Sequence, residues 1–417
     1  MQALQTRSAL RDSRFAMFFV GQGISNIGNQ AFSLAMYWFV QMSTGEPALV
    51  AWLAAAQFAP QIIAVLVGPY ADRYDRRRLL IATDIFRGVV VGYVAVLSYF
   101  HTNIIVTLFV VVVLLGLSTN LFESAVFGFV PDIVPSASLL SANSLIGAST
   151  KLAVVLGSAL GAVLLAQLGP RSFLLFDALT FGVSVLTLYT IRSGRGGAPP
   201  DPPTTYGARR WLHELGMGLR EVSTNRLTRY LYPAFFLSNV FLVPFSVLLP
   251  SWAHADLHTT AAGYSAMELL WAAGAVVGAT LAPKLSERLG FRALLASSFV
   301  LQAVLVLFTV ESTLLWSAAV LFVFGAANSV SNALLSVVMQ RLFSADMLGR
   351  VTSIALSVNG SGTPIGAALA GALVPFVGVT AILIVAGVGT GLVWSYVAIA
   401  ASRSWHSDDF SFAFAEQ

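Results

Sequence analysis

The chain has 417 residues, of which 57% are apolar and only 10% carry a charge. This balance excludes an ordinary water-soluble enzyme or regulatory domain, because about a quarter of the residues of such a domain are charged. The chain has no cysteine, so disulfides and thiolate metal sites are excluded as well. The formal net charge of +4 comes from arginines that lie between apolar segments. We therefore expect a membrane protein that binds no nucleic acid.

Apolar segments long enough to cross a hydrocarbon core of about 30 Å recur along the whole chain. The first begins after Arg14 and is followed by further spans, so we expect a retained helix and not a cleaved signal peptide. The stretches Gly88–Phe122 and Val351–Ser402 contain no charged residue and are each long enough for two crossings. Together these patterns predict twelve helices, near residues 15–40, 48–69, 80–100, 104–128, 139–167, 172–191, 230–252, 263–284, 293–310, 314–338, 351–373 and 380–400.

The distribution of arginine predicts the orientation of these helices. An even number of helices places both termini on the same side of the membrane. If that side is the cytoplasm, the external loops contain one basic residue, Arg171, and nearly all other loop arginines are cytoplasmic. This asymmetry is what the positive-inside rule requires, so we expect both termini in the cytoplasm.

The composition divides the chain into two predicted bundles of six helices, residues 1–192 and 230–402. Residues 193–229 form a linker between them, and residues 403–417 form a cytoplasmic tail. The linker opens with a stretch rich in glycine and proline and continues with an amphipathic pattern over Trp211 to Thr228. That pattern predicts a helix lying at the membrane surface.

Two stretches of the first half recur in the second half. Residues 24–34 match residues 237–247 at a shift of 213, and residues 71–80 match residues 286–295 at a shift of 215. Two shifts of nearly the same size mean that one order of helices and loops is used twice. We therefore predict two parallel repeats with a binding site between them near the bilayer midplane.

The segment from Gly68 to Arg78, with Asp72 and Arg73 at its centre, resembles the loop between helices two and three of the major facilitator superfamily. The segment that begins at Ser286 is similar to its degenerate second copy. The resemblance implies an all-α membrane fold of twelve helices in two parallel-repeat bundles, in the bacterial inner membrane, working as a monomer without a cofactor. Four further segments resemble the branch that contains the enterobactin exporter and macrolide efflux proteins: residues 25–30, 84–87, 130–135 and 349–351.

Polar residues inside the predicted spans are candidates for substrate binding. The first helix has a polar stripe, and amides are too costly to face lipid in such numbers, so we expect it to line a cavity, with helix packing as the alternative. Lys151 lies about twelve residues into the fifth helix, roughly 18 Å along it and near mid-membrane. It is predicted to hold an anionic substrate group or to pair with a carboxylate, the alternative being a permanent ion pair. The predicted substrate-binding residues are Gln22, Asn26, Asn29, Gln30, Tyr37, Lys151, Asn239, Phe241, Asn328 and Asn332.

Charged residues inside the spans are candidates for coupling and gating, because a charge at the bilayer centre costs at least about 2.5 to 3.5 kcal/mol. Glu123 lies in the inner part of the fourth helix. The resemblance implies that this acid forms a latch with Arg76 or Arg77, which closes the inner gate in the outward-facing state. The alternatives for Glu123 are a carboxylate that carries the coupling proton and an ordinary charge at a helix end.

The remaining embedded charges give weaker signals. Asp84 and Arg87 are three residues apart on one helical face, which predicts a local ion pair. Asp177 and Glu268 are expected in solvated positions near external helix ends, with coupling as the alternative role. The full set of predicted coupling or gating residues is Asp72, Arg73, Arg76, Arg77, Asp84, Arg87, Glu123, Asp177 and Glu268.

Enzyme chemistry is not expected. The string His254, Asp256 and His258 is more typical of a solvated loop than of a metal site, and the chain has neither a phosphate-binding loop nor a nucleophile beside a base. The predicted function is a secondary active exporter of an amphipathic organic solute of drug or siderophore type, coupled to protons by antiport and working by alternating access. One alternative is a lysophospholipid transporter or an uncoupled facilitator, which Asn29 favours because related proteins often have an acid there. A membrane sensor or scaffold that transports nothing is the other.

Overall fold

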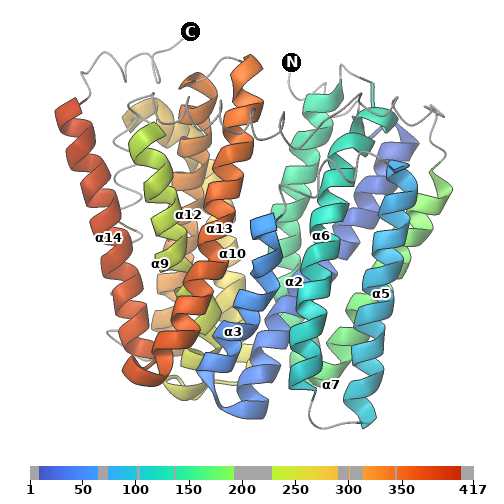
Figure 1. The fold of residues 1–417 in the computed structure, drawn as a ribbon, viewed down its shortest axis with the longest axis horizontal. Helices are drawn as coiled ribbons and strands as arrows, with labels where there is room; N and C mark the ends of the chain where they lie inside the picture. Colours follow the sequence, from blue (N-terminus) through green and yellow to red (C-terminus); the bar gives the residue numbers. More distant parts are fainter. Residues whose placement is uncertain are drawn as a thin grey trace. The chain divides into compact units, whose positions relative to one another are not determined.

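Helices are the only regular secondary structure in the described part of the chain. The computed structural model describes residues 9–63, 74–100, 104–135, 138–191, 228–289, 300, 313–342 and 345–404. Asp72, Arg73, the predicted linker helix and nearly all of the predicted ninth helix lie outside these residues. The helices are α2 Ser13–Thr44, α3 Pro47–Phe58, η1 Ala59–Ile63, α5 Arg76–Phe100, α6 Ile105–Ile133, α7 Leu139–Thr190, α9 Thr228–Ala255, α10 Ala261–Leu289, α12 Leu314–Leu342, α13 Ala345–Val377 and α14 Val379–Ser404 (Figure 1).

Most of these helices are suited to a bilayer. Within the described residues, seven helices are long and apolar enough to cross a membrane, and two shorter apolar helices cover Pro47–Ile63 and Leu174–Thr190. Helix α2 has 32 residues but is not among the seven, because its polar stripe lowers its mean hydropathy. The prediction of an all-α membrane protein is confirmed.

Helix α7 contains two antiparallel arms. The element spans 52 residues, and a straight helix of that length would measure about 78 Å, well over twice the hydrocarbon thickness. Its first arm runs parallel to α2 and its second arm runs antiparallel to it. The contacting pairs are Gln30–Gly157 and Leu34–Gly161 for the first arm, and Gly28–Thr180 and Gly21–Thr187 for the second. The chain therefore reverses between Gly161 and Thr180, as the predicted helices 139–167 and 172–191 require.

The chain divides into two compact units. Unit 1 comprises Met1–Met42 and Ala56–Tyr206, and unit 2 comprises Ser43–Ala55 and Gly207–Gln417. Most of α3 therefore belongs to unit 2, where Trp52 lies against Gly371 of α13. The units differ in this respect from the predicted bundles, whose boundaries remain a prediction.

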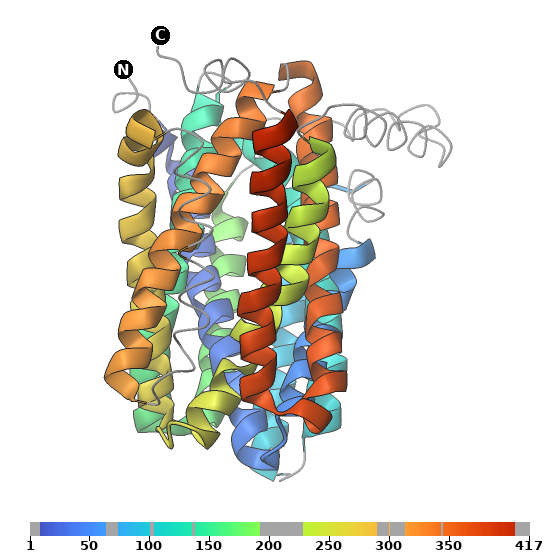
Figure 2. The ribbon, with the colours of Figure 1, turned by 90° about the vertical axis from the view of Figure 1, so that its left-hand side faces the viewer.

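Unit 2 repeats the packing of unit 1. Its first described long helix, α9, lies parallel to α13 and antiparallel to α14, as α2 does with the two arms of α7; α14 stands beside α9 in both Figure 1 and Figure 2. The contacting pairs are Phe236–Gly362 and Val240–Gly366 for α13, and Phe241–Gly389 and Phe235–Trp394 for α14. The same arrangement of a central helix and its two neighbours thus occurs twice, in agreement with the predicted repeat.

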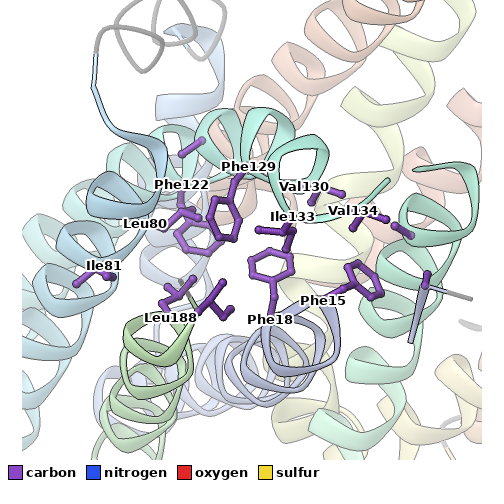
Figure 3. Close-up of a cluster of buried hydrophobic side chains, with 14 residues drawn as sticks. Phe15, Phe18, Leu80, Ile81, Phe122, Phe129, Val130, Ile133, Val134 and Leu188 are labelled. Atoms are coloured by element: carbon purple, nitrogen blue, oxygen red, sulfur yellow. The ribbon is translucent and has the colours of Figure 1, made fainter. Parts of the chain in front are cut away.

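An apolar cluster fixes one end of unit 1, where α2 and α5 begin and α6 and α7 end. Phe18 and Phe129 lie at its centre with ring centroids 5.5 Å apart, and Leu80 and Leu188 close it from α5 and α7 (Figure 3). All four side chains are almost completely buried. The cluster holds the four helices in register, and this register positions the polar groups about two turns further along α5.

We expect Gly157→Ala to destabilise the protein. A Cβ atom at this position would lie 2.8 Å from Cβ of Gln30 and 2.9 Å from the carbonyl oxygen of Ile27, so α2 and α7 would have to separate. Overpacking of this kind costs about 1 to 3 kcal/mol, and the midpoint of thermal unfolding in detergent measures it. Gly147→Ala is the control on the same arm, because nothing lies within 4 Å of its Cβ position. An unchanged midpoint for Gly157→Ala would show that α7 does not approach α2 this closely.

Candidate functional site

A charged network lies inside unit 1 and centres on Arg87. Arg87 and Asp84 of α5 are 4% and 0% exposed, with Nη1 3.4 Å from Oδ1. The other oxygen of Asp84 accepts a hydrogen bond of 2.6 Å from Ser184, whose hydroxyl oxygen accepts one from Gln22. Arg87 also donates to the carbonyl oxygen of Ser118 at 3.0 Å. These five residues, the Arg87 network, join α2, α5, α6 and α7, and the predicted pair of Asp84 and Arg87 is confirmed.

Two further carboxylates act electrostatically on Arg87. They belong to Asp177 in the second arm of α7 and Glu123 in α6. Asp177 is 1% exposed; its Oδ1 lies 3.4 Å from the hydroxyl of Thr180, and its Oδ2 has no hydrogen-bond partner among the described residues. The expected solvated position of Asp177 is therefore wrong. Gly28 has no side chain, so α2 approaches closely enough to cover the carboxylate.

Aromatic rings replace water around the guanidinium group. The Cζ atom of Arg87 lies 4.5 Å from the ring centroid of Phe122 and 5.8 Å from that of Phe181. A cation over an aromatic face is stabilised by the ring quadrupole, more strongly where water is excluded. The rings thus help to keep a charge inside a membrane-spanning bundle.

A polar pocket of about 220 Å³ lies beside the Arg87 network, entirely within unit 1. We call it the amide pocket, because most of its polar groups are amides. Gln57 donates to Ser33 at 3.2 Å and accepts a hydrogen bond from Tyr37, and Asn120 donates to the carbonyl oxygen of Pro60 at 2.6 Å. The residues that line the pocket are Asn29, Phe32, Ser33, Gln57, Phe58, Gln61, Arg87, Val112, Leu115, Gly116, Thr119, Asn120 and Phe181.

The side chains of the polar stripe of α2 lie in two different places. Some line a pocket and others pack against a neighbouring helix, which are the two alternatives that the sequence left open. Asn29 lines the amide pocket, and Tyr37 fixes a glutamine of its wall. Gln22 and Gln30 instead face α7, where Gln22 bonds Ser184 and Gln30 lies against Gly157. Asn26 is half-buried between these groups on the same helix.

The two arginines at the start of α5 bind helix ends. Arg76 donates to the carbonyl oxygen of Gly128 at 2.9 Å and lies 3.3 Å from Asp132. Arg77 donates to the last carbonyl oxygens of α7, those of Leu188 and Tyr189. The charge that acts on Glu123 is that of Arg87, not of either arginine predicted for the latch. Arg76 and Arg77 lie beside the helix ends, whereas Glu123 lies more than one turn before the end of α6, level with the Arg87 network.

The candidates in unit 2 are engaged mainly with their own helices. The amide of Asn239 donates to the carbonyl oxygen of Phe235, and Phe241 packs on Gly389 of α14. Asn332 donates to the side chain of Asn328 at 2.8 Å, one turn earlier in α12. Glu268 is half-buried and hydrogen-bonded to Tyr264 in α10, and its expected solvated position stays a prediction. Nothing here assigns a substrate-binding role to these residues, which remains a prediction.

Two further candidates are Lys151 and the histidine string of the predicted loop. Lys151 belongs to the first arm of α7, and its side chain lies outside the described part of the structure. Among the described residues, no group of three metal-ligating side chains occurs, the string His254, Asp256 and His258 included.

Several functional candidates were missed from the sequence. Gln57 and Gln61 follow an apolar run of α3, and Thr119 and Asn120 lie within the apolar α6. Ser184 is one of several hydroxyl residues in the apolar second arm of α7. In each case the sequence contains a polar residue inside an apolar span. The same pattern selected the candidates in the first helix, and it would also have selected the residues of α3, α6 and α7.

Comparison with known proteins identifies the family. The family model described as Major Facilitator Superfamily matches residues 18–366 and 231–411. The chain belongs to the Major Facilitator Superfamily. Its members are membrane transporters and not enzymes, and the predicted family is thereby confirmed.

Relatives and solved structures agree with this membership. The chain is 25% identical over 374 residues to the multidrug efflux pump Tap of Mycobacterium tuberculosis, covering 87% of this chain and 85% of that protein. It is 26% identical over 387 residues to an uncharacterised transporter of Sinorhizobium fredii of the same superfamily type. The nucleoside transporter NupG shares the fold at a TM-score of 0.73 and 12% identity, covering 94% of this chain and all of the other. A bacterial homologue of ferroportin in the inward-facing state has a TM-score of 0.71 at 15% identity, covering 93% of this chain and 98% of the other.

We expect the pair of Asp84 and Arg87 to show strong energetic coupling in a double-mutant cycle with Asp84→Asn and Arg87→Gln. Removing one partner leaves the other charged and buried, whereas removing both does not. The coupling energy is expected to be about 1 to 3 kcal/mol, measured by unfolding in detergent.

The pair of Arg76 and Asp132 is the matched control. Its separation of 3.3 Å is nearly the same, but its side chains are 30% and 44% exposed. Solvated pairs contribute about 0 to 1 kcal/mol. Equal coupling in the two cycles would contradict the structural role of the buried pair.

Proposed function

We propose that this chain is a secondary active exporter of amphipathic organic solutes in the bacterial inner membrane, with both termini in the cytoplasm, and that it exchanges solute for protons by alternating access. The similarity to multidrug efflux pumps over most of the chain supports export of drug-like solutes. The positive-inside pattern of arginines supports the orientation. A monomer is sufficient for this mechanism, because the family fold contains both repeats in one chain.

The observation that carries the proposal is the amide pocket beside the Arg87 network. A pocket for a complete drug molecule has about 300 to 1,000 Å³. The amide pocket, at about 220 Å³, fits only part of such a molecule. Its amides and hydroxyls supply donors and acceptors, while Phe32, Phe58 and Phe181 supply apolar surface. We infer that it takes the polar part of an amphipathic solute.

The carboxylates beside the pocket, two of them buried, support proton coupling. Asp84, Glu123 and Asp177 surround one guanidinium group, so the group of four carries more acid than base. Charges in a membrane interior must be paired or neutralised, and a proton is the simplest neutralising ion. Loading and unloading of a proton here changes the charge beside the pocket, which is what coupled exchange requires.

A proteoliposome assay tests the function. Purified protein in vesicles with an acidic lumen is expected to accumulate ethidium, erythromycin or enterobactin, and collapse of the pH gradient by an ionophore is expected to release it. Accumulation of a lysophospholipid alone would favour the lipid-transporter alternative. Equilibration of a probe across the membrane that does not respond to the pH gradient would favour an uncoupled facilitator. If no probe moves, the alternative of a membrane sensor or scaffold is favoured.

The contribution of the pocket is tested by Asn29→Leu. This substitution keeps the side-chain volume and removes a donor and an acceptor from the pocket wall. We expect the half-saturating concentration of the transported probe to rise about threefold to tenfold, as the loss of one hydrogen bond of about 0.5 to 1.5 kcal/mol implies. Asn143→Leu is the control, because Asn143 is an exposed amide outside the pocket. Equal effects of the two substitutions would remove the pocket from the binding site.

A further inference from the structure

Two buried polar atoms in unit 1 complement each other. Nε of Arg87 is a donor and Oδ2 of Asp177 is an acceptor, and both lack a hydrogen-bond partner among the described residues. The side chains are 4% and 1% exposed, and they interact electrostatically. Buried polar atoms without partners are uncommon and call for an explanation. Each of these two atoms is the kind of partner that the other lacks.

The other carboxylates around Arg87 are in different settings. Asp84 is fully engaged, since one oxygen receives Arg87 and the other receives Ser184. Glu123 is exposed on α6. Asp177 alone of the three is both buried and incompletely bonded, with Thr180 of its own helix on one oxygen. An uncharged carboxylic acid fits a setting in which one oxygen has no donor.

Asp177 is also close to the amide pocket. Its carboxylate touches α2 at Gly28, and the next residue, Asn29, lines the pocket. One turn along its own helix, Phe181 lines the pocket together with Arg87. The groups that face Asp177 are therefore the backbone of α2, Arg87 from α5 and Thr180 from its own helix, with Asp84 and Glu123 acting through Arg87.

We propose that Asp177 binds the coupling proton and that Arg87 transmits its protonation state to the amide pocket, an inference that rests on the proposed proton-coupled export. With the proton on Oδ2, Asp177 is neutral and Arg87 keeps the place on the pocket wall that it has in this structure. When the proton leaves for water, Asp177 gains one negative charge, and Arg87 turns Nε–H to Oδ2 and withdraws from the pocket wall. The O–H bond of Asp177 is the one covalent bond that changes, its proton goes to water, and no co-reactant is required.

The exchange of proton and solute follows from this movement. Withdrawal of Arg87 removes positive charge from the pocket and enlarges it, so the deprotonated state binds the polar part of a solute. Rebinding of the proton returns Arg87 to the pocket and expels the solute. Proton and solute then exclude each other without touching the same atom, and Arg87 is the positioning residue between them.

Infrared spectroscopy of the full-length protein in lipid tests the proton site without any solute. The difference spectrum between alkaline and acidic buffer is expected to contain a carboxylic acid C=O band that is lost in Asp177→Asn and retained in Asp84→Asn. Persistence of the band in Asp177→Asn would overturn the assignment. Since no transport is measured, this result does not depend on whether the proposed function is correct.

The role of Arg87 is tested by Arg87→Lys, which keeps the charge but lacks the Nε–H donor. The titration midpoint of the same band is expected to shift relative to the unaltered protein, whereas Arg76→Lys, at the solvated end of α5, is expected to leave it in place. An unchanged midpoint in Arg87→Lys would exclude Arg87 as the transmitter.

Transport then connects the site to coupling. Asp177→Asn is expected to lose accumulation of ethidium driven by a pH gradient by at least about tenfold, while exchange of ethidium at equal concentrations continues. If the unaltered protein shows no gradient-driven accumulation, the proposed function fails. If it does, and Asp177→Asn accumulates ethidium equally well, this inference alone fails.

Discussion

The structure of unit 1 depends on the compensation of one buried cation. A guanidinium group inside a membrane-spanning bundle needs carboxylates, carbonyl groups or aromatic faces around it to offset the loss of water. Arg87 meets Asp84, the carbonyl oxygen of Ser118 and the ring of Phe122, which come from two helices. Ser184 connects Asp84 to a third helix. The contacts that compensate this charge therefore also connect the helices that surround it, so a change of the charge would alter the contacts of all of them.

Close helix contacts make this compensation possible. In a lipid bilayer the hydrophobic effect does not drive helices together, so van der Waals packing and interhelical hydrogen bonds have to stabilise their association. At Gly28 and Gly157 the absence of a side chain brings α2 and α7 into backbone contact range. This proximity covers Asp177 and lets Gln22 reach Ser184. Helix α2 is too polar to count as a span by its mean hydropathy, but its polar stripe faces α7 and the amide pocket, where Gln22 bonds Ser184 and Asn29 lines the pocket wall.

The sequence predicts the features that depend on local spacing. Twenty-residue apolar runs predict the helices, and a separation of three residues predicts the pair of Asp84 and Arg87. Burial of Asp177 was predicted wrongly, because it depends on a glycine in another helix far away along the chain. The amide pocket was missed for the same reason, since Gln57 and Asn120 become neighbours only when α3 and α6 pack. A third case is the partner of Glu123, where the resemblance suggested the loop arginines and the register of α6 selects Arg87.

The two units share their packing but not their chemistry. In each, a central helix runs parallel to one neighbour and antiparallel to another, so the duplicated scaffold alone cannot distinguish them. The embedded charged groups distinguish them. The described part of unit 1 contains the Arg87 network. In the described part of unit 2, the embedded acid Glu268 bonds a tyrosine of its own helix. A fold built from two equal halves is suited to alternating access, because each half can tilt against the other. Coupling needs no such symmetry. It needs one place where a charge change alters the solute pocket, and we propose that the Arg87 network beside the amide pocket is that place within unit 1.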